Sequence, residues 1–172
     1  MSGPVNAAHP ALAPLVSRQT RLLILGSFPG VASLKAQQYY AHPQNHFWRI
    51  LQAIWPGGPI ITLQDSYQNR SEWLLARGLG LWDVYASCER EGSLDSNIRN
   101  AVLNDFSALN ELCPDLQAIA HNGGESFKHS KLTAVLGLPV HKLPSTSPAN
   151  ASWSFEKKLA AWRDLIEKYK LA

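Results

Sequence analysis

The sequence predicts an α/β protein, a three-layer α/β/α sandwich around a central, mainly parallel sheet of four strands. Two observations support this fold. Four short apolar segments have the length and composition of strands, and the segments between them carry apolar residues at helical spacing. Because strands that alternate with helices pair in parallel through right-handed crossovers, we expect helices on both faces of the sheet.

The first predicted strand is the apolar segment 21–25, which is uninterrupted, as in a strand buried on both faces of a parallel sheet. A second strand is predicted at 81–85, where residues that favour β-structure follow two closely spaced glycines. Two further apolar segments, 116–120 and 140–143, complete the predicted sheet.

The predicted helices differ in the clarity of their apolar spacing. Segment 45–55 has apolar residues every three or four positions and ends at Pro56-Gly57-Gly58-Pro59. A weaker helix is predicted over 65–77. The terminal helix begins at Phe155 and is amphipathic, with its apolar positions at Leu159, Trp162, Ile166 and Tyr169.

Shorter elements lie between these segments. A helix capped by Asn104 or Asp105 is predicted to run through Leu112, and another to follow Gly124 as far as about Val135. The polar, charged segment 87–96 is predicted to be an exposed connection.

Length and composition predict one domain over residues 18–172, preceded by a mobile lead-in over 1–17 that is rich in Ala and Pro. No apolar run approaches the roughly 20 residues that cross a membrane, and the start lacks a secretory signal pattern. We therefore expect a cytoplasmic protein. Nothing in the sequence demands a dimer, so a monomer is expected.

The cysteine and charge content limit the possible sites. Cys88 and Cys113 are distant in sequence, and no His cluster has ligand spacing, so we expect neither a metal nor a cofactor. The net charge of +3 is compatible with a polyanionic partner and is also common among ordinary enzymes.

The loop Gly26-Ser27-Phe28-Pro29-Gly30 follows the first predicted strand directly. Ligands of open α/β sheets bind at the carboxyl ends of the strands, and glycines let the backbone approach a ligand closely. The loop lacks the Gly-Lys-Ser/Thr ending of a phosphate loop and the spacing of a dinucleotide fingerprint. A binding site of another kind is therefore predicted here.

Three loops, 26–45, 121–124 and 144–150, should meet at this edge of the sheet. Each also has a purely structural interpretation. Asn45 stands just before a predicted helix, where Asn commonly serves as an N-cap, and His42 can be an ordinary hydrogen-bonding loop residue. Likewise Tyr40 can be a half-buried aromatic, and Asn122 can belong to a turn.

Three segments taken together resemble the uracil-DNA glycosylase superfamily. They are the glycine loop 26–30, Tyr40-Ala41-His42-Pro43-Gln44-Asn45-His46-Phe47-Trp48, and Leu143-Pro144-Ser145-Thr146-Ser147-Pro148. Within the superfamily the chain is most similar to the hypoxanthine-DNA glycosylase branch. Mismatch-specific uracil and thymine glycosylases share the second segment, but carry Asn in the glycine loop where this chain has Phe28.

The resemblance implies roles for individual residues. Asn45 takes the catalytic role of positioning the attacking water, because Phe28 cannot hold it. The base-binding residues are then Tyr40, as the stacking aromatic, with Asn122 at the base edge and Gly26, Ser27 and Phe28 in the loop. DNA-binding residues are expected at the mouth of the site: His42, Ser145, Thr146, Ser147 and Pro148.

The function implied is that of a monofunctional DNA glycosylase. It would flip a deaminated base, most simply hypoxanthine, out of DNA and hydrolyse its N-glycosidic bond. An alternative is excision of uracil or thymine at mismatches. A third possibility, from a different class, is a DNA-binding module that keeps the fold without catalysis.

Overall fold

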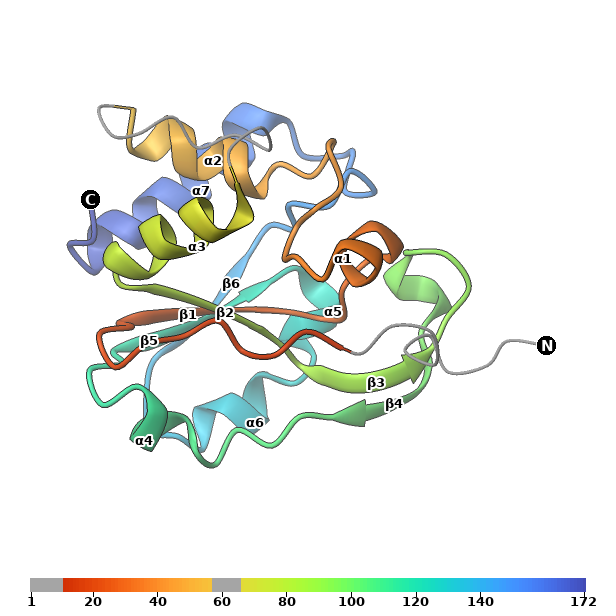
Figure 1. Cartoon of the computed structure of the whole chain (residues 1–172), viewed down its shortest axis with the longest axis horizontal. Helices are drawn as coiled ribbons and strands as arrows, with labels where there is room; N and C mark the ends of the chain where they lie inside the picture. The colour runs from red at the N-terminus through yellow and green to blue at the C-terminus, as the bar shows by residue number, and fades with distance from the viewer. Residues whose placement is uncertain (1–10, 57–65) are drawn as a thin grey trace.

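A central sheet of four parallel strands organises the protein, whose computed structural model describes residues 11–56 and 66–172. The strand order is β2-β1-β5-β6 (Figure 1). The strands are β1 (Leu22–Gly26), β2 (Leu79–Asp83), β5 (Ala118–Asn122) and β6 (Val140–Leu143). The predicted parallel four-stranded sheet is therefore confirmed.

The strand register brings four residues to one edge of the sheet. Gly26 pairs with Asp83, and Asn122 pairs with Leu143. Each of these is the last residue of its strand, so the loops that follow all leave from the same edge. This is the edge where ligands of parallel sheets bind.

Helices cover both faces of the sheet (Figure 1). On one face lie α2 (Phe47–Ile54), α3 (Tyr67–Ala76) and α7 (Phe155–Lys168); on the other lie α4 (Leu109–Leu112), α5 (Gly124–Phe127) and α6 (Ser130–Ala134). Successive residues of β1 serve different cores, since Ile24 belongs to a cluster with Trp162 and Leu25 to a cluster with Phe106. The sandwich therefore has two apolar layers.

The predicted terminal helix is confirmed as α7. Its N-cap is Ser154, whose side chain accepts a hydrogen bond from Lys157 N. Trp162 is fully buried on its inner face, in the cluster shared with α2. The other two predicted helices on this face appear as α2 and α3; residues 57–65, where one was predicted to end and the other to begin, lie outside the described residues.

The prediction of an exposed connection over 87–96 is confirmed for residues 91–96 and wrong for 87–90. Strand β3 (Tyr85–Glu89) pairs antiparallel with β4 (Arg99–Leu103), and together they form the β3–β4 ribbon. Between the strands, Arg90 is only 6% exposed because its guanidinium donates to Pro29 O at 2.6 Å and to Gly92 O at 2.9 Å. This polar segment is therefore structured, and the charged guanidinium of Arg90 is buried within it.

Three smaller features also differ from the sequence-based expectation. Helix α1 (Val31–Ala36) was not predicted, and the helix expected to reach Val135 is divided into α5 and α6. The N-cap of α4 is Ala108, without a side-chain bond. Of its predicted caps, Asn104 donates to Asp83 O, and Asp105 accepts from Ser107 N in a turn before the helix.

Residues 11–17 differ from the expected lead-in because they pack onto the domain. Leu12 is buried, Leu15 N donates to Leu81 O at 2.8 Å, and Ala13 O accepts from the Tyr39 hydroxyl at 2.8 Å. Residues 1–10 lie outside the described part of the chain. Within residues 11–56 and 66–172, no helix is long and apolar enough to cross a membrane.

Candidate active site

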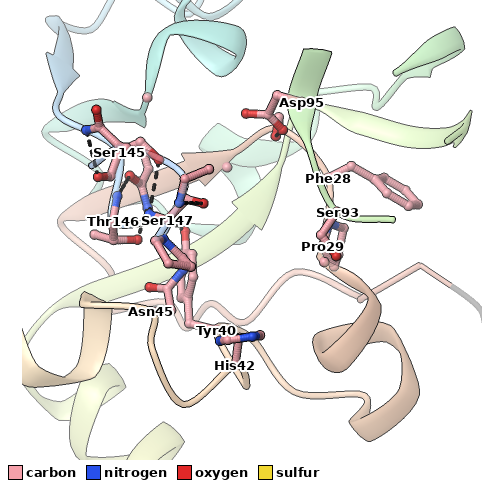
Figure 2. A pocket seen from close by; sticks show the side chains of 18 of the residues that line it. Phe28, Pro29, Tyr40, His42, Asn45, Ser93, Asp95, Ser145, Thr146 and Ser147 are labelled. Atoms are coloured by element: carbon pink, nitrogen blue, oxygen red, sulfur yellow. Dashed lines mark hydrogen bonds between the residues drawn. The ribbon is translucent and has the colours of Figure 1, made fainter. Parts of the chain in front are cut away.

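A pocket of about 1030 Å³ opens where the carboxyl ends of the four parallel strands meet. All three predicted loops contribute to its lining, as do residues 93–96 of the ribbon connection. Figure 2 shows side chains of Ser145–Ser147, Asn45 and Tyr40 on one side and of Phe28, Ser93 and Asp95 on the other. The pocket contains every residue that the sequence assigned to the site.

Polar contacts from the ribbon connection hold the glycine loop. Ser27 Oγ donates to Asp95 Oδ1 at 2.6 Å, and the Val31 N–H donates to Ser93 Oγ at 2.9 Å. Arg90 adds its bond to Pro29 O, and its guanidinium lies 5.5 Å from the Phe28 ring centre. The Phe28 ring packs into the second apolar cluster, so it offers the pocket little surface.

Gly26, Asp83 and Tyr40 form the floor of the pocket. A Cβ atom on Gly26 would lie 2.7 Å from Asp83 Oδ1 and 3.5 Å from the Tyr40 hydroxyl oxygen. The absence of a side chain at Gly26 therefore makes room for the carboxyl group of Asp83. Both polar groups face the same small volume above the end of β1.

Asp83 is only 6% exposed, and its Oδ2 has no hydrogen-bond partner within the described residues. Burial raises the pKa of Asp83 to about 7, although the charge of Arg90 acts to lower it. Sequence reasoning missed Asp83 because it placed the second strand two residues too late. With the correct strand end, Asp83 would have stood out as a polar residue at the carboxyl end of an apolar strand.

Tyr40 is held by its backbone, its ring and its hydroxyl. Its φ of 54° is in the left-handed region, which is uncommon for a residue with a side chain. The ring stacks on Phe47 at a centroid distance of 4.2 Å, and the hydroxyl accepts from Asn122 Nδ2 at 3.1 Å. Burial, followed by the charge of Asp83, raises the pKa of Tyr40, so the hydroxyl stays neutral.

Asn122 and Thr146 are joined by two hydrogen bonds. Asn122 Nδ2 donates to Thr146 Oγ1, and Asn122 Oδ1 accepts from Thr146 N, both at 3.1 Å. Thr146 is 1% exposed, so its hydroxyl is not at the surface where a phosphate contact was expected. Ser145 and Ser147 are half-buried, and Pro148 is exposed, so these three lie nearer the mouth.

Asn45 lies just before α2 and lines the pocket. Its Oδ1 accepts from Phe47 N at 2.9 Å, two residues along the chain, which fixes the orientation of the amide. Among the described residues, no hydrogen-bond partner contacts Asn45 Nδ2. Nearby, His42 is exposed, and its Nδ1 accepts from Gln44 N.

His46 and Lys158 connect the Asn45 loop to the Ser145–Ser147 loop. His46 N donates to Thr146 O at 3.0 Å. Lys158, on α7 and 1% exposed, places Nζ 3.3 Å from both His46 Nδ1 and Ser147 O. Burial lowers the pKa of Lys158, and its amine joins the two loops through these two contacts.

The sequence matches a known family over nearly its whole length. A sequence model of the Uracil DNA glycosylase superfamily matches residues 13–166. The chain belongs to this superfamily. A hypoxanthine DNA glycosylase of Methanosarcina barkeri is 36% identical to this chain over 155 residues, which cover 90% of this chain and 96% of that protein.

Two further relatives agree with this assignment to the uracil DNA glycosylase superfamily. A hypoxanthine DNA glycosylase of Methanosarcina acetivorans is 39% identical over 143 residues, which cover 81% of this chain and 87% of that protein. The solution structure of a Methanosarcina acetivorans protein proposed to be a uracil DNA glycosylase superposes with a TM-score of 0.82 at 32% identity. The match covers 94% of this chain and 98% of that one.

Several pocket residues of this superfamily member were not found by sequence reasoning. They come from the ends of β2 and β6, the ribbon connection and the segment before α7: Asp83, Ser93, Leu94, Asp95, Lys142, Asn150 and Trp153. Three of them, Ser93, Leu94 and Asp95, belong to the segment predicted as an exposed connection, and Asp83 and Lys142 lie in predicted strands. Within the described ranges, no group of three or more His, Cys, Asp or Glu side chains could hold a metal ion.

Proposed function

We propose that this protein is a monofunctional DNA glycosylase that releases hypoxanthine from deoxyinosine in DNA. The observation that carries the proposal is the pocket, which places the Asn45 amide, the Tyr40 ring and the Asp83 carboxyl around one cavity. The activity named for both Methanosarcina relatives supports hypoxanthine as the base.

The pocket is large enough for a flipped nucleotide. Its volume of about 1030 Å³ is at the upper end of typical small-molecule sites, so a purine and its sugar fit within it. Extrusion of the base from the stack costs a few kcal/mol, and less for a mispaired base such as hypoxanthine. The Tyr40 ring and the residues at the end of β1, Gly26 and Ser27, line the pocket and are then available to the base.

In this proposal, Asn45 orients the attacking water. Its bond to Phe47 N occupies one lone pair of Oδ1, which leaves the second lone pair and Nδ2 for a water molecule. The N-cap of α2 is His46, so Asn45 stabilises the turn before the helix and is not its N-cap. The same bond fixes the amide, so the turn-stabilising and water-positioning roles are compatible. A neutral amide suffices because the oxocarbenium-like sugar needs an oriented water more than a strong nucleophile.

DNA contacts are proposed around the mouth of the pocket. His42 and Pro148 are exposed there, and the Ser145 and Ser147 hydroxyls are partly accessible. Lys142 is exposed and also lines the pocket, so it adds a positive charge that phosphate can meet. Thr146 acts indirectly, by holding the loop through Asn122.

Excision of uracil or thymine at mismatches is the second candidate. The enzymes of that group that the sequence resembles carry Asn at the position of Phe28. Here the Phe28 ring lies in an apolar cluster beside Arg90, so the side chain at this position cannot hold a water as that Asn does. The observation therefore favours hypoxanthine over the mismatch substrates.

A direct assay tests the proposed function. The purified protein is incubated in EDTA with labelled duplexes that contain one hypoxanthine, uracil or xanthine, and alkali then reveals abasic sites. We expect cleavage of the hypoxanthine duplex at the highest rate. Binding without cleavage of any duplex would instead identify a non-catalytic DNA-binding module, and preference for uracil would favour the second candidate.

A further inference from the structure

The carboxyl group of Asp83 is an unusual feature of the pocket floor. Oδ1 faces the space above Gly26, whereas Oδ2 is buried without a hydrogen-bond partner among the described residues. Within residues 11–56 and 66–172, Asp83 forms no ion pair; the one salt bridge there joins Lys128 and Glu125. A side chain that is 94% buried and unpaired in a ligand pocket requires a functional explanation.

The surroundings of Asp83 favour its neutral form. A carboxylate with a desolvated, unpaired oxygen is costly, and a carboxylic acid in the same place costs much less. The charged groups that act on it are Arg90, which favours the carboxylate, and Asp95, which favours the acid. The titratable groups beside it are Tyr39 and Tyr40, both of which have raised pKa values because they are buried and close to Asp83.

We infer that Asp83 is the general acid of the reaction and donates its proton to a ring nitrogen of the extruded purine. This inference rests on the proposed function. Its geometric basis is that Asp83 shares the pocket floor with Tyr40, on which the base is expected to stack. A pKa of about 7 suits this task, because an acid is most effective when its pKa lies near the working pH.

The step balances without any further reagent. As the C1′–N9 bond breaks, its electron pair passes to the purine, and the proton of Asp83 passes to N3 or N7, so that neutral hypoxanthine leaves. The water held by Asn45 forms the new C1′–O bond. Its proton returns to Asp83 directly or through solvent, and the products are hypoxanthine and an abasic sugar.

Such an acid complements what Asn45 provides. The amide of Asn45 orients water but cannot remove its proton efficiently, so the reaction depends on departure of the base. A purine leaves more easily when it is protonated than as an anion. Asp83 therefore supplies protonation of the leaving base, which the Asn45 amide cannot provide.

Single-turnover excision with enzyme in excess tests the role of Asp83, because it measures the chemical step apart from binding. From about pH 5.5 to 8.5, the rate of the parent protein should fall above the pKa of Asp83, approaching about tenfold per pH unit. Asp83→Asn keeps the size of the side chain but has no acidic proton. It should be roughly a hundredfold slower or more below that pKa, with a flat profile.

Asp164→Asn is the matched control, because it removes an exposed carboxylate on α7 outside the pocket. It should retain the parent rate and profile. Thermal unfolding of each variant checks that differences in rate do not come from misfolding. Equal rates and profiles for the parent protein and folded Asp83→Asn would overturn the inference.

Substrate analogues test the proton transfer in the parent protein, independently of any variant. Duplexes with 3-deaza- or 7-deaza-deoxyinosine each lack one candidate acceptor. We expect one analogue to be excised roughly a hundredfold more slowly and to show little further loss with Asp83→Asn. Excision of both analogues at the deoxyinosine rate would overturn the inference.

The two proposals fail in different ways. If the parent protein releases no hypoxanthine at any pH, the proposed function is wrong. If it releases hypoxanthine at a rate that does not change across this pH range, the proposed function stands and the role of Asp83 as an acid is wrong.

Discussion

Gly26 and Asp83 end adjacent strands in register, and a Cβ atom on Gly26 would lie only 2.7 Å from Asp83 Oδ1. The Gly26→Ala substitution should therefore displace the Asp83 carboxyl. We expect excision of hypoxanthine to fall by roughly tenfold or more, as loss of a positioned catalytic group does. Single-turnover kinetics measure this effect, and a thermal melt reports the accompanying loss of stability.

Gly80→Ala provides the control for this crowding. A Cβ atom there would lie 2.8 Å from Thr20 Cγ2, outside the pocket. It should lower the melting temperature while the folded fraction keeps its excision rate. If both variants lost excision activity to the same extent, general steric crowding of the sheet, and not displacement of Asp83, would explain the effect of Gly26→Ala.

Asn45 should contribute to both stability and catalysis. Asn45→Ala removes the bond to Phe47 N, which should cost about 0.5–2 kcal/mol of unfolding free energy. It should also slow excision by roughly a hundredfold or more, with little change in DNA affinity. Asn45→Asp keeps an acceptor for Phe47 N, so it should restore stability and retain partial activity that rises as its carboxylate ionises.

Ser66→Ala separates the two effects of Asn45, because Ser66 caps α3 and does not line the pocket. It should cost a similar free energy of unfolding and leave the excision rate unchanged. An Asn45→Ala protein that melts lower but excises hypoxanthine at the parent rate would show that Asn45 only stabilises the turn before α2.

Tyr40 should act mainly through its ring. Tyr40→Phe loses one hydrogen bond to Asn122, worth about 0.5–1.5 kcal/mol, but keeps the stack on Phe47 and should be mild. Tyr40→Ala removes the aromatic surface and should severely reduce excision and weaken binding of the hypoxanthine duplex. Tyr169→Phe, which removes a hydrogen bond to His141 outside the pocket, is the control.

The sequence revealed the parts of the fold that have clear local patterns. The apolar residues of β1 and the helical spacing around Trp162 predicted a buried strand and the terminal helix, and both are confirmed. The β3–β4 ribbon was missed because its segment is polar and its buried Arg90 looks like a surface residue. The contacts of Arg90 with Pro29 and of Asp95 with Ser27 join segments more than 60 residues apart, which no local pattern reveals.

In the site, too, some residues have a local sequence signal and others depend on contacts between distant segments. Tyr40 and Asn45 lie in one distinctive segment, and Asn122 was predicted from its place after the third predicted strand; all three line the pocket. Asp83 has no such local signal, since its significance depends on the end of β2 and on the space left by Gly26. Similarly, Thr146 looks like a surface hydroxyl until the structure shows its bonds to Asn122.

Lys142 should strengthen DNA binding through charge alone. Its side chain is exposed beside the pocket, so Lys142→Gln should weaken binding to any duplex and reduce the salt slope of log K by about 0.9 if it neutralises one phosphate. Lys170→Gln, an exposed change after α7, should alter neither quantity. Fluorescence anisotropy over a range of salt concentrations measures both, and an unchanged slope for Lys142→Gln would exclude the phosphate contact.

Helix α7 makes the shape of the site depend on a helix that carries none of the proposed catalytic residues. Lys158 Nζ lies 3.3 Å from both His46 Nδ1 and Ser147 O, and Trp162 Nε1 donates to Pro144 O at 3.1 Å, so α7 holds the two loops of the site together. A chain that lacks α7 lacks these contacts. Premature termination before Lys158 should therefore yield fragments that cannot create abasic sites in intact DNA.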